Sequence, residues 1–180
     1  MNKKKYISLR LLLVLLLATI VLSSCGRGNM SPERALRNFS NRIEQGNLDG
    51  LTLTIYYKNT VIIRVPITVE DLVERGWYEY KIVVDGNELE EHIELLRQIN
   101  ADILTPIAHD FPMLARLYYV FEVNGRKIFD VVPQAAGDDS FMFINGVEFE
   151  WNDAFFDVIR PFLPEDVVRR WDASIMPDDQ

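Results

Sequence analysis

Asp130 is the ionisable residue whose sequence surroundings are most unusual, because it lies within an apolar β-type pattern. Asn124-Gly125 separates two such runs, Leu114–Val123 and Arg126–Val132, and a two-residue type I′ turn there predicts that Tyr119 pairs with Asp130. In that register the carboxylate shares a face with apolar and aromatic residues, namely Leu117, Tyr119, Phe121, Ile128 and Val132. A buried carboxylate needs hydrogen-bond donors or takes a raised pKa. We expect structural hydrogen bonds to Asp130, with a ligand-contacting or catalytic role as the alternative.

The histidines are the next candidates for chemistry. His109 is followed by Asp110 in a proline-containing loop, Asn100–Pro112, and this pair could join Asp130 and Tyr119 in a small polar site. A nucleophilic triad needs a geometry that adjacent residues do not supply, and the chain has no Gly-x-Ser-x-Gly elbow. His92 is expected on the polar flank of a helix. The sequence therefore predicts no catalytic residue.

Metal and cofactor motifs do not occur in the sequence. Two isolated histidines lack the spacing of a zinc site. Asp85, Asn87 and Glu90 differ from a calcium loop, whose sixth position is glycine where this chain has Glu90. Neither Gly-x-x-x-x-Gly-Lys nor Gly-x-Gly-x-x-Gly is present. We therefore expect no metal and no cofactor.

The pattern of elements predicts an α+β domain. Ser31 as N-cap, Pro32 and Gly46 delimit a first helix, whose basic face we expect to be solvated rather than membrane-facing. A half-buried strand over 51–57 precedes a second β-run, Val61–Val65. Further elements are expected in order: a helix at 70–75 capped by Thr68, a strand at 78–84, and a helix at 88–99 capped by Asn87 with Glu90.

A second Asn-Gly hairpin and two helical segments complete the predicted domain. Asn145-Gly146 joins β-type runs at 140–144 and 147–151, and helical patterns follow around Phe155–Phe162 and Glu165–Trp171. These elements predict a mostly antiparallel sheet built from hairpins, with helices before, between and after the strands. We expect the first hairpin's sheet to be covered on both sides, or to meet a partner on one. Phe141 and Phe143 are expected to be covered by a helix, with a partner surface as the alternative.

The first 28 residues have the order of a secretory signal. Lys3, Lys4, Lys5 and Arg10 precede an apolar run, Leu11–Leu22, which is short for a transmembrane helix. Leu22-Ser23-Ser24-Cys25 then ends in the only cysteine of the chain. Removal of residues 1–24 leaves 15 basic and 27 acidic residues, so the net charge changes from −8 to −12. Such an acidic chain without a Lys/Arg-rich run does not suit nucleic acid.

This segment resembles a bacterial lipoprotein signal, in which Leu22-Ser23-Ser24-Cys25 is the lipobox. The resemblance implies lipid attachment at the Cys25 sulfur, cleavage before Cys25, further acylation by chains such as palmitate, and an extracytoplasmic location on the cell membrane. The remainder is similar to small uncharacterised lipoproteins of Gram-positive bacteria in Tyr118–Val123 and Pro161–Glu165. That likeness implies no activity.

The expected organisation has four parts. Residues 1–24 are the signal peptide, 25–30 a tether, 31–171 a single α+β domain, and 172–180 a frayed tail. The first functional hypothesis is a membrane-tethered, non-enzymatic interaction or binding domain with an unknown protein or small-molecule partner. The alternative is a small-ligand-binding or weakly catalytic domain with its site near Asp130 and loop 100–112.

Overall fold

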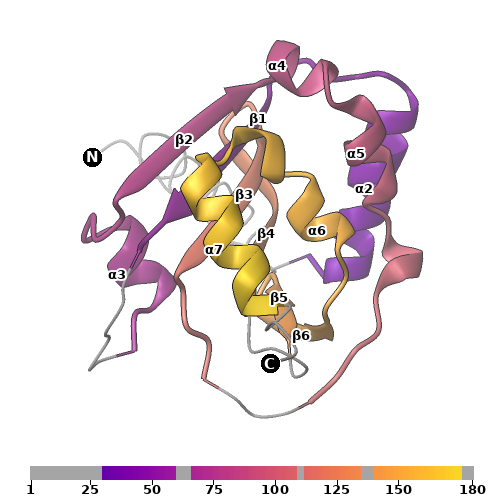
Figure 1. Cartoon of the computed structure of the whole chain (residues 1–180). Helices are drawn as coiled ribbons and strands as arrows, with labels where there is room; N and C mark the ends of the chain where they lie inside the picture. Colours follow the sequence, from indigo (N-terminus) through magenta and orange to yellow (C-terminus); the bar gives the residue numbers. More distant parts are fainter. Residues whose placement is uncertain (1–29, 60–65, 109–111, 135–139, 176–180) are drawn as a thin grey trace, which may run out of the picture. The chain divides into compact units, whose positions relative to one another are not determined.

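Six antiparallel strands form a single sheet in the order β2–β1–β3–β4–β5–β6 (Figure 1). The computed structural model describes residues 30–59, 66–108, 112–134 and 140–175. All of the described strands and helices belong to the unit formed by residues 31–180. The strands are β1 (Leu51–Tyr57), β2 (Tyr80–Asp85), β3 (Leu117–Val123), β4 (Arg126–Gln134), β5 (Phe141–Ile144) and β6 (Val147–Glu150).

Helices precede, separate and follow these strands, so the fold is α+β as predicted. The α-helices are α2 (Pro32–Glu44), α3 (Val69–Val73), α4 (Gly86–Glu90), α5 (Ile93–Gln98), α6 (Ala154–Asp157) and α7 (Glu165–Ile175). Two short 3₁₀ segments are η1 (Ala101–Ile103) and η2 (Arg160–Phe162). Among these described helices, none is both long and apolar enough to cross a bilayer.

Local sequence signals account for several element boundaries. Asn124 and Asn145 have φ of 51°, and Gly125 and Gly146 have φ of 72° and 80°, which confirms both predicted type I′ turns. The predicted N-cap of α2 is also confirmed, because the Ser31 hydroxyl accepts a hydrogen bond from the Arg34 N–H at 3.4 Å. These boundaries depend on short-range geometry, which is why composition and spacing predict them.

Both faces of the sheet carry a buried core. On one face, strand residues such as Leu53, Tyr119 and Phe121 pack with apolar side chains of α2, α4, α5, α6 and α7. Figure 1 shows α6 and α7 crossing in front of the sheet. The other face has a smaller cluster, which includes Phe141 and Phe143. It is joined by Ile67 just before α3, by Leu72 of α3, and by three residues between η1 and β3: Ile107, Met113 and Ala115. The expected two-sided covering is therefore confirmed.

The predicted register of the first hairpin is wrong beyond its turn. Val123 pairs with Arg126 and Glu122 with Lys127, but Phe121 then pairs with Phe129, so β4 has one more residue than β3 at this point. This β-bulge shifts every later pair by one position. Val120 lies opposite Asp130, and Tyr119 lies opposite Val131. Asp130 is consequently on the opposite face from Tyr119, because neighbouring strand residues point to opposite sides.

The predicted helix at 88–99 begins earlier and is divided. Asp85, not Asn87, is the N-cap: its carboxylate accepts hydrogen bonds from the N–H groups of Asn87 and Glu88 at 2.9 and 3.2 Å. The helix stops at Glu90 and restarts at Ile93, with His92 between the two segments. The half-buried His92 ring contacts Phe162 edge-on at 5.1 Å, so its setting is a packing contact and not a polar helix flank.

Other boundaries differ less. Helix α7 continues to Ile175, so residues 172–175 are helical where a frayed tail was predicted, and the rest of that predicted tail lies outside the described residues. The predicted loop at 100–112 contains η1 and a β-bridge between Pro106 and Phe149. The predicted strand Val61–Val65 lies outside the described residues, and β1 is paired on its two edges with β2 and β3.

The Thr68–Asp71 capping box yields a pH prediction. The Thr68 N–H, the Thr68 hydroxyl and the Arg75 guanidinium all lower the pKa of the Asp71 carboxyl, the first most strongly. A lowered folded-state pKa means that this stabilisation is complete above the unfolded value of about 4 and is lost as pH falls through the folded pKa. We expect Asp71→Asn to lower the melting temperature near neutral pH, with a difference from wild type that shrinks on acidification below that value. The exposed Asp102→Asn is the control, and a difference independent of pH would contradict the argument.

Candidate ligand-binding site

Asp130 is held by its own neighbours on the smaller core face. Its carboxylate is 2.6 Å from the Lys127 Nζ and accepts a hydrogen bond from the Tyr118 hydroxyl at 3.3 Å. Its backbone N–H donates to the Asn145 side-chain oxygen at 3.1 Å, which links β4 to the second hairpin turn. Burial first, and then the Asp130 charge, raise the pKa of the Tyr118 hydroxyl. These contacts are the structural hydrogen bonds expected of a largely buried carboxylate.

Tyr119 has a different partner on the other face. Its fully buried hydroxyl donates to the Phe155 carbonyl at 2.6 Å, and burial raises its pKa well above the ordinary value. The structure therefore does not bring Asp130 and Tyr119 together. His109 and Asp110, the other members of the predicted polar site, lie outside the described residues. Within the described part of the chain, no three His, Cys, Asp or Glu residues are grouped so that they could hold a metal ion.

A pocket that the sequence did not predict lies at one end of the strands, and we call it the strand-end pocket. Its volume is about 450 Å³, which is in the range of small-molecule sites. The lining comes from the end of β1, the chain entering β3, the end of β4, and α7: Tyr57, Lys58, Asn59, Leu114, Arg116, Pro133, Gln134, Arg170, Trp171 and Ala173. Because neighbouring strands are antiparallel, the last residues of β1 and β4 and the first residues of β3 meet at the same end of the sheet.

Hydrogen bonds fix the backbone around the strand-end pocket. The Gln134 side chain is buried, and its Nε2 donates to the carbonyls of Leu114 and Pro133 at 2.7 and 3.1 Å. Its Oε1 accepts from the Leu114 N–H at 3.3 Å. The Lys58 N–H donates to the Arg116 carbonyl at 2.8 Å and extends the β1–β3 pairing into the pocket. The lining segments therefore hold a defined arrangement before any ligand binds.

Positive charge dominates the lining. Lys58, Arg116 and Arg170 contribute cations, and none of the lining residues that the structure describes carries a carboxylate. Arg170 also pairs with Asp166, one turn back on α7. Burial raises the pKa of the Tyr57 hydroxyl most strongly; the charges of Arg170 and Arg116 oppose that rise, while those of Glu79 and Asp166 add to it. Since Arg170 is on α7 and Arg116 precedes β3, guanidinium groups from two separate elements act on the same hydroxyl.

Trp171 supplies an unused donor. It is 7% exposed, and its buried indole N–H has no hydrogen-bond partner among the described residues. Its ring is stacked on Phe156 at 5.5 Å and lies 6.4 Å from the Trp151 ring. A buried donor without an acceptor has lost its hydration without replacement, which makes such groups rare in folded proteins.

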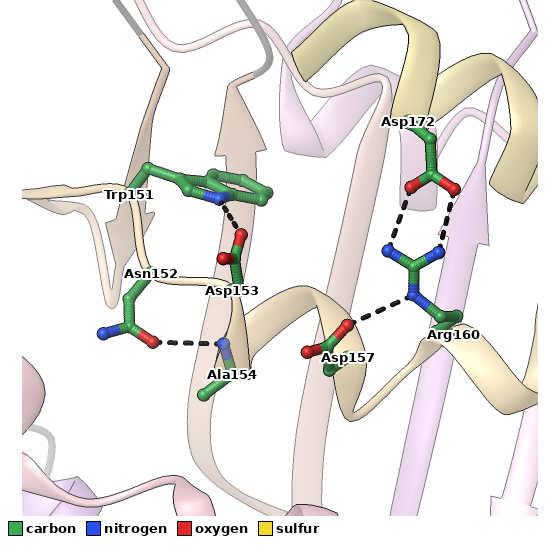
Figure 2. Close-up of polar contacts among 7 residues, drawn as sticks. All are labelled: Trp151, Asn152, Asp153, Ala154, Asp157, Arg160 and Asp172. Carbon is green, nitrogen blue, oxygen red and sulfur yellow. Dashed lines mark hydrogen bonds and ion pairs between the residues drawn. The ribbon is translucent and has the colours of Figure 1, made fainter. Parts of the chain in front are cut away.

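Polar contacts around α6 hold α7 in place (Figure 2). The Arg160 guanidinium donates two hydrogen bonds to Asp172, both of 2.9 Å, and its Nε donates to Asp157 at 3.1 Å. The same guanidinium lies 4.8 Å from the Phe156 ring centre. At the start of α6, the Trp151 indole N–H donates to Asp153 at 2.7 Å, and the Asn152 side chain accepts from the Ala154 N–H. These contacts position the helix that carries Arg170 and Trp171.

The sequence offers no local signal for this pocket. Lys58, Arg116 and Arg170 are far apart in the chain, and each resembles an ordinary solvated charge at its own position. Gln134 is the one hint, since it is a polar residue at the end of a largely apolar β-run. Only strand pairing and the seating of α7 bring these residues together.

Replacement of Tyr119 tests its structural role. Tyr119→Phe leaves the buried Phe155 carbonyl without its donor, so we expect a loss of about 1–3 kcal/mol in the free energy of unfolding. Urea denaturation measures the loss. Tyr118→Phe is the matched control and should cost less, because Asp130 retains its Lys127 partner. A larger loss for Tyr118→Phe would contradict the assignment of the Tyr119 hydroxyl as the tie between β3 and α6.

No protein-family model, no curated protein and no solved structure matches the chain.

Proposed function

We propose that this protein is a lipid-anchored binding protein on the extracytoplasmic face of a bacterial cell membrane, and that its domain binds a small molecule in the strand-end pocket without transforming it. The anchor in this proposal is Cys25, and its support is the order of residues in the first 28 positions. Two or more acyl chains hold a protein stably on a bilayer, whereas one chain does so only marginally.

The observation that carries the binding role is the strand-end pocket itself. A volume of about 450 Å³ with both apolar and polar walls suits a small organic molecule. Its walls are set by hydrogen bonds within the domain, so binding would order few additional groups. Acid–base catalysis most often uses histidine or a carboxylate, and neither is among the described lining residues. This composition favours binding over turnover.

A protein partner is the second candidate. Among the described strands, β2 is at the edge of the sheet, and Tyr80 and Val83 within it are exposed, as is Trp77 just before it. An edge strand presents backbone groups that another chain can pair with. We place this candidate second because these three side chains are exposed on the surface, whereas the strand-end pocket is a formed cavity of about 450 Å³.

The anchor is tested by metabolic labelling. Cells supplied with an alkyne-bearing fatty acid should label the wild-type protein, which should sediment with membranes. Cys25→Ala removes the sulfur that accepts the lipid, so label and sedimentation should both be lost. Ser24→Ala keeps a small residue before the cysteine and should retain both. Label persisting on the Cys25→Ala protein would refute the anchor.

Pocket occupancy is tested with fluorotryptophan, because the chain has three tryptophans in different settings. We expect hits from a small-molecule fragment collection to move the ¹⁹F signal of Trp171 and to leave that of exposed Trp77 in place. Ala173→Phe adds bulk at the pocket wall and should abolish these shifts. Fragments that move only Trp77, or that bind equally to the Ala173→Phe protein, would locate binding elsewhere.

A further inference from the structure

The charge of the strand-end pocket is opposite to that of the protein. The chain has 19 basic and 27 acidic residues, yet the described residues of the lining include three cations and no carboxylate. The salt bridges among the described residues do not include Lys58 or Arg116. A concave wall of one sign concentrates the field and attracts ions of the opposite sign.

Lys58 and Arg116 lie directly opposite each other. Tyr57 pairs with Leu117 in the antiparallel β1–β3 ladder, so the next pair outward is Lys58 with Arg116. The 2.8 Å hydrogen bond from the Lys58 N–H to the Arg116 carbonyl confirms that position. Like charges directly opposite across two strands are destabilising. An anion bound between these two side chains would turn the repulsion into two favourable contacts.

The rest of the lining favours an organic anion over a bare inorganic ion. Leu114, Pro133 and Trp171 give apolar wall, and the volume of about 450 Å³ greatly exceeds the space a single oxyanion needs. Trp171 lines this wall through its ring, while its unpartnered indole N–H is itself buried. Arginine presents paired N–H donors that match the geometry of carboxylate and phosphate oxygens.

We propose that the strand-end pocket binds a small organic anion, with its carboxylate or phosphate group held by Arg116 and Lys58 and its apolar part against Trp171 and Pro133. This inference rests on the proposed binding function and specifies the chemical class of the ligand. Arg170, already paired with Asp166, adds positive potential from the opposite wall.

The test compares probes that share a ring and differ in charge. The full-length lipidated protein, purified from membranes in detergent and labelled with fluorotryptophan, is titrated with benzoate, phenyl phosphate, benzyl alcohol and benzylamine. We expect both anions to shift Trp171 with affinities at least about tenfold higher than that of benzyl alcohol, since charge-assisted hydrogen bonds are about twice as strong as neutral ones. Benzylamine should bind weakest. The ranking of benzoate against phenyl phosphate separates a carboxylate ligand from a phosphate ligand.

Variants assign the preference to named residues. Arg116→Gln and Lys58→Gln should each reduce the affinity for the anions about tenfold or more and leave that for benzyl alcohol unchanged. Arg34→Gln, an exposed arginine on α2, is the matched control and should change nothing. Unchanged Trp77 and Trp151 signals verify that each variant is folded.

The outcomes separate the two proposals. Equal affinities for benzoate and benzyl alcohol at Trp171 would overturn the anion inference and leave the binding function standing. Anion binding that is insensitive to both Arg116→Gln and Lys58→Gln would also overturn it. If no fragment of any charge moved Trp171, the binding function itself would fail, and the anion inference with it.

Discussion

The architecture depends on the one-residue bulge between β3 and β4. A shift of one residue in a strand exchanges its two faces, so this bulge decides which side chains of β4 enter which core. It brings Phe129 beside Phe121 on the face that α2 and α4–α7 cover, which we call the helical face. There both rings pack on Phe39 of α2, with ring centres 5.2 and 4.8 Å away. It also sends Asp130 to the other face, where Lys127 and Tyr118 meet its carboxylate. Because Asp130 is on the other face, the surface that these helices cover is apolar and has no buried, unpaired carboxylate at its centre.

The strand-end pocket follows from that arrangement. Tyr119 remains on the helical face and ties β3 to α6 through the Phe155 carbonyl, and the Arg160 contacts then hold α7 against α6. Helix α7 in turn forms one wall of the pocket, while paired strand ends form the other. The register of β3 and β4 thus determines where α6 and α7 pack, and the position of α7 determines the lining of the pocket. The charge of that lining is opposite to the net charge of the chain.

Much of the fold was predictable because its signals are short-range. Positive φ at Asn-Gly, a serine before proline, and a period-two apolar pattern each act within a few residues, so β1, α2 and both hairpin turns lie where the sequence places them. The start of α4 was misplaced because Asp85 with Glu88 and Asn87 with Glu90 offer the same capping pattern two residues apart. The local pattern does not decide between them, whereas the end of β2 at Asp85 does.

The site was not predictable in the same way. By itself the sequence determines the α+β class, the turns, most helix starts and a signal-like first segment, because each is encoded by neighbouring residues. The tertiary structure alone decides that Asp130 and Tyr119 point to opposite faces, and that Lys58, Arg116 and Arg170 line one pocket. A bulge has no composition of its own, and charges distant in sequence become neighbours only through strand pairing and helix packing. The physical reason is that register and helix seating minimise the free energy of the whole domain rather than that of any single segment.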